Sequence, residues 1–143
     1  MKKIVTIAAV AALTASSLTM AQSFEEAFNM NRAMYGAGAT FEWEGKSYNT
    51  SYIEEELASK PANKENAEAL IAAAEAKYKE AQEVGFAWRD NSKYLKEAQD
   101  ALAAGEFQKA MDLAARSHLQ SRRGVEQAAY AEQNWILAVP PLN

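Results

Sequence analysis

The chain has 143 residues, of which 49% are hydrophobic and 24% are charged, and its acidic residues outnumber Lys and Arg by 19 to 15, for a net charge of −4. That length suits one domain with a modest core, and the acidic balance argues against nucleic acid and anionic lipid as partners. The absence of cysteine excludes disulfides, a lipid-modified N-terminal cysteine and covalent attachment of a c-type haem.

The N-terminus predicts a secretory signal peptide. Lys2 and Lys3 precede an apolar run over residues 4–18, and Thr19 and Ala21 place small residues three before and one before a cut after Ala21. The run is short for a membrane anchor, which needs about 20 apolar residues. We therefore expect a periplasmic protein that is not inserted in the membrane once the leader is removed.

The cleavage site itself has an alternative, because Ala15 and Ser17 form a second pair of small residues. Removing 21 of the 143 residues leaves 122, and the loss of two lysines lowers the net charge from −4 to −6. The mature chain is therefore still one domain, and it is more acidic than the precursor.

Residues 22–60 predict an N-terminal subregion that starts with a helix. Ser23 and Glu26 have the spacing of a capping box, in which each side chain bonds the backbone N–H of the other residue. The apolar side chains of residues 24–34 fall largely on one stripe, and Gly36 follows them as a helix stop.

A β-hairpin is expected next. Residues 40–43 and 46–50 are rich in aromatic and β-branched side chains and flank a Glu-Gly pair. Alternation places Phe41 and Trp43 on one face, where Tyr48 of the second strand can meet them. Because an isolated hairpin is only marginally stable, we expect these aromatic rings to rest on the helices.

Three consecutive glutamates, beginning at Glu54, lie in a stretch (residues 51–58) that predicts one or two helical turns. Their charges are favourable near the N-terminal end of a helix dipole. We interpret them as a solvated acidic face rather than as a glycosidase pair, which would also need a sugar cleft. Pro61 disfavours helix at the preceding residue and marks the boundary of the subregion.

The remaining segment, residues 61–143, predicts a helical bundle domain with an apolar C-terminal tail. Asn63 is a good N-cap, and Gly85 and Gly105 fit left-handed stops that divide the segment into three helices. We expect Gly124 to fray or bend the third helix.

Each of these helices carries one apolar stripe at steps of three and four residues. The stripes are Ala67, Leu70, Ile71, Ala74, Tyr78, Ala81 and Val84; Tyr94, Leu95, Ala98, Ala101 and Leu102; and Phe107, Ala110, Met111, Ala114 and Ala115. The predicted fold class is mainly α: an Ala-rich antiparallel bundle of three to four helices with a small N-terminal β-hairpin.

The chain offers little for catalysis or for a metal. His118 is the only histidine, and without cysteine it lacks the partners of a zinc or copper site. Ser117 and Ser121 lie near it on a predicted helix, without the elbow or oxyanion-hole glycines of a serine hydrolase. We interpret His118 as a packed or partly exposed residue, and we expect no enzyme activity, no metal and no cofactor.

Arg116, Arg122 and Arg123 form a small basic patch on this acidic chain. The patch has two interpretations. It is either a solvated face of the last helix or a site for an acidic partner, and the solvated face is the simpler of the two.

Aromatic residues mark the turns between the predicted helices. The first turn contains Phe86, Trp88, Arg89 and Asp90, and Phe107 follows the second. Such residues either close the ends of the bundle or stay exposed and bind a protein partner, since Trp and Arg are enriched at interface hot spots. For the charged pair, a surface contact between Arg89 and Asp90 is the alternative.

Residues 67–115, about a third of the chain, resemble the small periplasmic SoxXA-binding proteins of bacterial sulfur oxidation. The resemblance rests on an Ala-rich helix, the turn VGFAWRD at residues 84–90, a Lys-rich second helix, and AAGEFQKA at residues 103–110, which opens the third helix. The first turn is the more specific motif, because many helical hairpins use the second.

The resemblance implies a non-enzymatic accessory protein that binds the SoxXA c-type cytochrome, assists thiosulfate oxidation and holds no cofactor of its own. It makes Trp88, Arg89 and Asp90 the first positions for partner contact, with Phe86 and Phe107 added from their places at the turns. The alternative is a structural or chaperone-like periplasmic bundle of the cell envelope whose aromatic residues all lie in the core. A small hydrolase is a more distant alternative.

Overall fold

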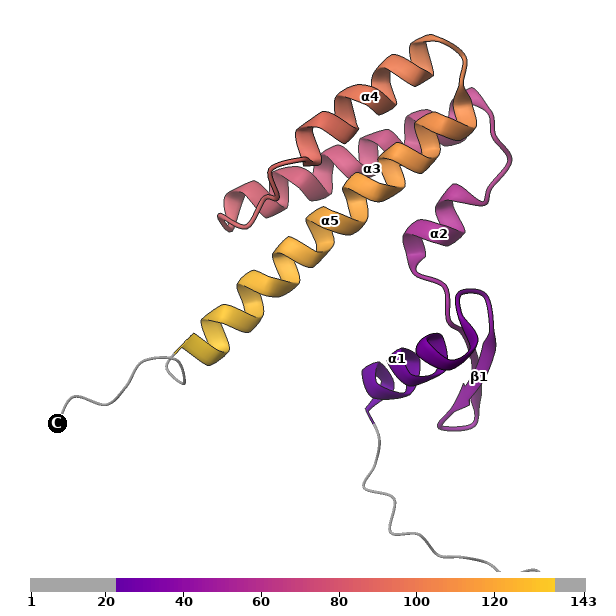
Figure 1. The fold of residues 1–143 in the computed structure, drawn as a ribbon, viewed down its shortest axis with the longest axis vertical. Helices are drawn as coiled ribbons and strands as arrows, with labels where there is room; N and C mark the ends of the chain where they lie inside the picture. The colour runs from indigo at the N-terminus through magenta and orange to yellow at the C-terminus, as the bar shows by residue number, and fades with distance from the viewer. Residues whose placement is uncertain (1–22, 136–143) are drawn as a thin grey trace, which may run out of the picture.

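The computed structural model describes residues 23–135, which form five helices and one two-stranded antiparallel sheet (Figure 1). The predicted signal peptide, its cleavage sites and the tail after Trp135 lie outside the described residues. In chain order the elements are α1 (Phe24–Tyr35), β1 (Thr40–Trp43), β2 (Lys46–Asn49), α2 (Ile53–Ala58), α3 (Lys64–Glu83), α4 (Asn91–Ala103) and α5 (Phe107–Asn134).

The predicted Ala-rich bundle is confirmed. Helices α3, α4 and α5 pack on one another with short connections, so that successive helices are antiparallel (Figure 1). Seven of the eleven residues in their buried core are alanines, which lets the helices approach closely: Ala67, Leu70, Ile71, Ala74, Leu95, Ala98, Ala101, Ala110, Met111, Ala114 and Ala115. No helix within residues 23–135 combines the length and the hydropathy that a membrane span requires.

Local signals place the helix ends. The side chain of Asn63 accepts a hydrogen bond of 2.8 Å from the backbone N–H of Asn66 and caps α3, as predicted. Gly85, with φ of +76°, follows α3 in the left-handed conformation that a side chain disfavours. One stripe position departs from the prediction: Val84 is exposed rather than buried.

The N-terminal hairpin is also confirmed, with Phe41 opposite Tyr48 across the ladder. Its aromatic rings rest on α1 rather than on the three-helix bundle. The ring of Phe24 lies 5.9 Å from that of Phe41, 5.4 Å from that of Trp43 and 4.9 Å from that of Tyr48, measured between centroids. The capping box of Ser23 is present as predicted and fixes the start of α1.

The five helices within residues 23–135 exceed the predicted three to four, because α1 and the helical turns predicted within residues 51–58, which form α2, add to the three helices of the bundle. This short helix, α2, packs on α5, whereas α1 packs on β1 (Figure 1). The N-terminal subregion is therefore joined to the bundle through α2, and one side of α5 faces α1.

Candidate functional site

Residues 84–90, which connect α3 to α4, bring together four of the five predicted contact residues, Phe86, Trp88, Arg89 and Asp90. The turn packs against α5 at Gly124. Phe107 lies at the start of α5, half-buried against the core. About 25 Å of helix separate it from Gly124, so Phe107 is not part of the same surface.

Gly124 marks the closest approach between the turn and α5. A Cβ atom on this residue would lie 2.3 Å from the carbonyl oxygen of Phe86 and 3.7 Å from Cδ1 of Trp88. The helix does not fray at Gly124, because α5 continues through it from Phe107 to Asn134. The glycine instead leaves a notch in the helix surface, and the backbone of the turn fills it.

A buried polar contact fixes the turn from the other side. Asn91, the first residue of α4, is fully buried, and its Nδ2 donates a 2.9 Å hydrogen bond to Oγ of Ser121. Oγ of Ser117 donates to the carbonyl oxygen of Asn91 over 3.4 Å. Both serine hydroxyls near His118 in the sequence are thus turned to Asn91.

Trp88 stands beside the notch with 40% of its surface exposed. Its Nε1 donates a 3.0 Å hydrogen bond to Oε1 of Gln127, one helical turn beyond Gly124. The ring is therefore held in one place by the glycine notch and by Gln127, although it is not in the core. A large aromatic ring that is both fixed and accessible suits partner binding.

Arg89 and Asp90 form the surface pair that the sequence offered as an alternative. Nε of Arg89 lies 3.2 Å from Oδ1 of Asp90, and this hydrogen bond raises the pKa of the guanidinium. The side chain of Arg89 is nevertheless 92% exposed. An exposed pair of this kind contributes little to stability, so Arg89 is available to a partner.

A second group of residues, which the sequence did not bring together, joins α2 to α5. We call it the Glu54 cluster: Tyr52, Glu54, His118, Arg122 and Arg123. The interpretation of Glu54 as part of a solvated acidic face is wrong, because only 2% of its surface is exposed. Nδ1 of His118 lies 2.8 Å from Oε1 of Glu54, and Arg122 makes a two-point contact with the same carboxylate, at 2.9 Å and 3.1 Å.

The contacts set the protonation of the carboxylate. Burial alone would raise the pKa of Glu54, but hydrogen bonds from His118 and Arg122 more than offset it and lower that pKa to about 2. The hydrogen bond to Glu54 likewise raises the pKa of Arg122. Since an ionised carboxylate only accepts hydrogen bonds, Nδ1 of His118 carries the proton that it shares with Glu54.

Tyr52 completes the cluster as a flat surface for guanidinium groups. The Cζ atoms of Arg32, Arg122 and Arg123 lie 3.9, 5.3 and 5.2 Å from the centre of its ring. Arg123 also donates a 2.9 Å hydrogen bond to the Tyr52 hydroxyl. Arg32 of α1 makes a two-point contact with Glu55, at 2.7 and 2.8 Å, and so ties α1 to α2.

These contacts correct the interpretation of the basic patch as a solvated face for Arg122 and Arg123. Arg122 and Arg123 are both engaged by the Glu54 cluster and by the carboxylate of Glu126. Arg116 is separate from them and lies over the ring of Tyr94, at 4.4 Å from its centre. Arg122 and Arg123 thus belong to a joint between α2 and α5, whereas Arg116 is exposed.

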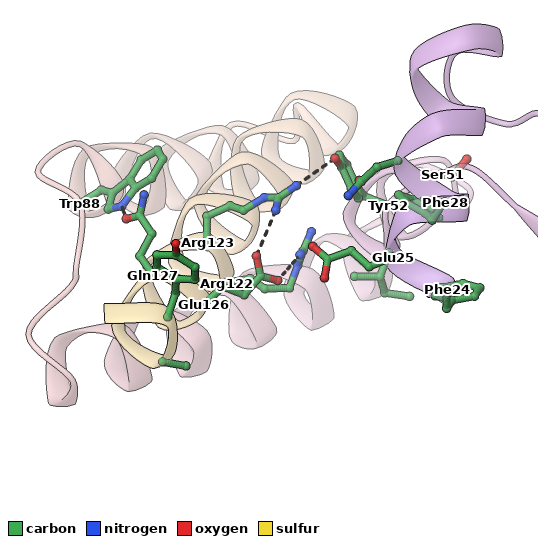
Figure 2. A pocket seen from close by; sticks show the side chains of 14 residues that line it. Phe24, Glu25, Phe28, Ser51, Tyr52, Trp88, Arg122, Arg123, Glu126 and Gln127 are labelled. Atoms are coloured by element: carbon green, nitrogen blue, oxygen red, sulfur yellow. Dashed lines mark hydrogen bonds and ion pairs between the residues drawn. The ribbon is translucent and has the colours of Figure 1, made fainter. Parts of the chain in front are cut away.

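The turn and the cluster border one open groove of about 1080 Å³, which we call the α1–α5 groove. Figure 2 shows Trp88 and Gln127 on one side of it, Tyr52, Phe28 and Phe24 on the other, and Arg122, Arg123 and Glu126 between them. Its further lining residues are Glu25, Asn29, Ser51, Ile53, Ala129 and Tyr130. The groove offers aromatic faces, amides and paired charges. In the part of the chain that the structure describes, no group of three or more His, Cys, Asp or Glu side chains is placed to hold a metal.

The sequence carried one signal for the cluster. His118 and Arg122 are four residues apart, so both donors face the same side of α5. That spacing indicates a place for an acceptor but does not identify which carboxylate fills it.

The cluster gives a pH dependence of stability. The folded-state pKa of Glu54, about 2, lies below the usual value of 4.5, so its contribution is present above pH 4.5 and is lost as the pH falls toward 2. We expect this loss to reach about 3 kcal/mol. The measurement is urea unfolding of the mature protein and of Glu54→Gln, whose amide does not titrate, from pH 6 to pH 2. The difference between the two proteins should shrink over that range, and a constant difference would contradict the assignment.

Comparisons with known proteins found no relative of this chain: no family model, no curated protein and no solved structure matches it.

Proposed function

We propose that the mature chain is a non-enzymatic periplasmic accessory protein that binds a protein partner at the surface around Trp88. The observation that carries this proposal is the ring of Trp88, which is exposed at the edge of the α1–α5 groove while Gly124 and Gln127 hold it in place. Trp, Tyr and Arg are the residue types enriched among the few that carry most of the binding energy at interfaces. Arg89, exposed beside Trp88, adds the second of these residue types.

The shape of the groove supports a macromolecular partner. Pockets for small ligands enclose about 300–1,000 Å³ and bury most of the ligand. The α1–α5 groove, at about 1080 Å³, is open to solvent and lies between two helices. A protein segment or surface fits such a groove better than a small molecule that must be enclosed.

The identity of the partner is proposed from the resemblance to SoxXA-binding proteins. The motif VGFAWRD, the most specific part of that resemblance, is the turn that presents Trp88 and Arg89. We therefore propose a SoxXA-type c-type cytochrome of thiosulfate oxidation as the partner. In this role the chain contributes a binding surface, and the redox chemistry belongs to the cytochrome.

The test is a calorimetric titration of purified SoxXA with the mature protein, which measures the affinity. We expect Trp88→Ala to weaken binding by about 30-fold, the effect of losing a hot spot of about 2 kcal/mol. Arg89→Ala should weaken it by a smaller factor. Tyr35→Ala is the matched control, because Tyr35 is a more exposed aromatic residue, at 63%, and does not line the groove.

The outcomes separate the parts of the proposal. If the unmutated protein does not bind SoxXA, the cytochrome is the wrong partner. If it binds and both substitutions leave the affinity unchanged, the surface around Trp88 is the wrong site. If the protein instead keeps unfolded periplasmic proteins in solution and binds no folded partner, the chaperone-like alternative replaces the proposal.

A further inference from the structure

A second hollow borders α5 and the turn between α3 and α4, and it shares Ala129 with the α1–α5 groove. Its apolar members are Val84 and Phe86 of the turn, Val125 and Ala128 of α5, and Trp135, which follows α5, and we call them the apolar strip. The hollow is open, with a volume of about 560 Å³, and Ala129, Ala131 and one charged residue, Glu132, also line it. Val84 is 43% exposed, Phe86 38% and Trp135 59%, so three large apolar side chains face solvent within one strip. Exposed apolar side chains that gather in one place, rather than singly, can mark an interaction site.

The sequence provides an occupant next to the strip. Trp135, the last described residue, is itself part of the strip, and residues 136–142, which follow it, read ILAVPPL. These seven residues are all apolar and carry no charge. Pro140 and Pro141 are residues that a helix interior does not accommodate.

The segment is also long enough to cover the strip. Seven extended residues span about 23 Å. The ten residues of α5 between Val125 and Trp135 span about 15 Å. A chain that reverses after Trp135 can therefore run back along α5 as far as Val125 and the turn that packs there.

We propose that residues 136–142 pack on the apolar strip of their own chain. Apolar side chains of the segment then cover Val84 and Phe86, and water leaves both surfaces. The tether makes even a weak contact effective, since a short linker gives an effective concentration in the millimolar range. The proposal does not depend on the partner of the α1–α5 groove. It gives two residues of the turn different roles. Phe86 is covered by residues 136–142 of the same chain, whereas Trp88 stays accessible to a partner.

The absence of cysteine allows a direct test, because a spin label can be placed at one introduced thiol. We would label Asn143→Cys in the full mature chain and record the amide spectrum with the label oxidised and reduced. The oxidised label should broaden the amides of Val84, Phe86, Val125 and Ala128. It should leave the amide of Phe107, at the far end of α5, unchanged.

Two further samples decide the alternatives. Val84→Ser, in which an exposed position becomes polar, should reduce the broadening while the rest of the spectrum stays the same. The second of these samples mixes spin-labelled chains that carry no isotope label with isotope-enriched chains that carry no spin label. It should show no broadening, because the contact is within one chain. No broadening in the labelled Asn143→Cys chain itself, or broadening spread evenly over the bundle, overturns the proposal. Broadening of the strip in the mixture also overturns it and makes a second copy the occupant.

Discussion

Replacing Glu54 by alanine should lower the free energy of unfolding at pH 7 by about 3 kcal/mol or more. The substitution leaves Arg122 and His118 without the carboxylate that they share, and removing one partner of a buried ion pair costs about 3–5 kcal/mol. Glu54 is 2% exposed and receives three hydrogen bonds from these two side chains. Urea unfolding followed by circular dichroism measures the change.

The control is Glu56→Ala, which removes the same charge from the same short helix at an exposed position. The side chain of Glu56 accepts one exposed hydrogen bond, from Nδ2 of Asn49 at 3.2 Å, so its replacement should cost less than about 0.5 kcal/mol. A double-mutant cycle of Glu54→Ala with Arg122→Ala should show a coupling of more than about 1 kcal/mol. Equal costs for Glu54→Ala and Glu56→Ala would mean that the cluster does not hold α2 on α5.

Replacing Gly124 by alanine should destabilise the protein by about 1–3 kcal/mol and displace Trp88. The added Cβ would lie 2.3 Å from the carbonyl oxygen of Phe86, so the turn must move away from α5. The effect opposes intrinsic helix propensity, which favours alanine over glycine by about 1 kcal/mol. Unfolding by urea gives the stability, and the indole N–H resonance of Trp88 reports the loss of its contact with Gln127.

Ala72→Gly provides the matched control, because Ala72 is exposed in the middle of α3. It measures what the exchange of glycine and alanine costs when no neighbour is touched. If Gly124→Ala stabilises the protein by the amount that Ala72→Gly destabilises it, the notch at Gly124 has no role. We expect instead that Gly124→Ala lowers the free energy of unfolding and weakens the binding of the partner.

The sequence predicts the parts of this fold that depend on neighbouring residues. The capping box of Ser23, the cap at Asn63 and the pairing of Phe41 with Tyr48 each involve residues close in the chain, and all three are confirmed. The apolar stripes of the bundle follow from helical periodicity alone. Such features need no knowledge of what packs against them.

The errors concern contacts between distant segments. Glu54 meets His118 and Arg122 across 64 and 68 residues, and its neighbours Glu55 and Glu56 look the same in sequence but stay exposed. Gly124 looks like a helix breaker until the turn that fills its notch is known. In both cases the environment that decides the role of the residue comes from another element.

The predicted contact residues do not all lie on one surface, and the sequence could not show this for the same reason. Phe86, Trp88, Arg89 and Asp90 are neighbours in sequence and share one turn, but Phe107 marks a different turn at the far end of α5. The α1–α5 groove could not be predicted, because it requires the placement of α1 and α2 against α5. That placement depends on the Glu54 cluster.

The alanine-lined core limits the direction in which this sequence can change. Only glycine is smaller than alanine, and glycine weakens a helix by about 1 kcal/mol. Every other replacement adds volume between helices that already lie close, so at Ala67, Ala74, Ala98 or Ala114 an enlarged side chain has to separate two helix axes. Substitutions are therefore tolerated mainly on the exposed faces of the helices. Within the core, Met111 is the position that best accepts a substitution, because a flexible methionine side chain fills space that other shapes can also fill.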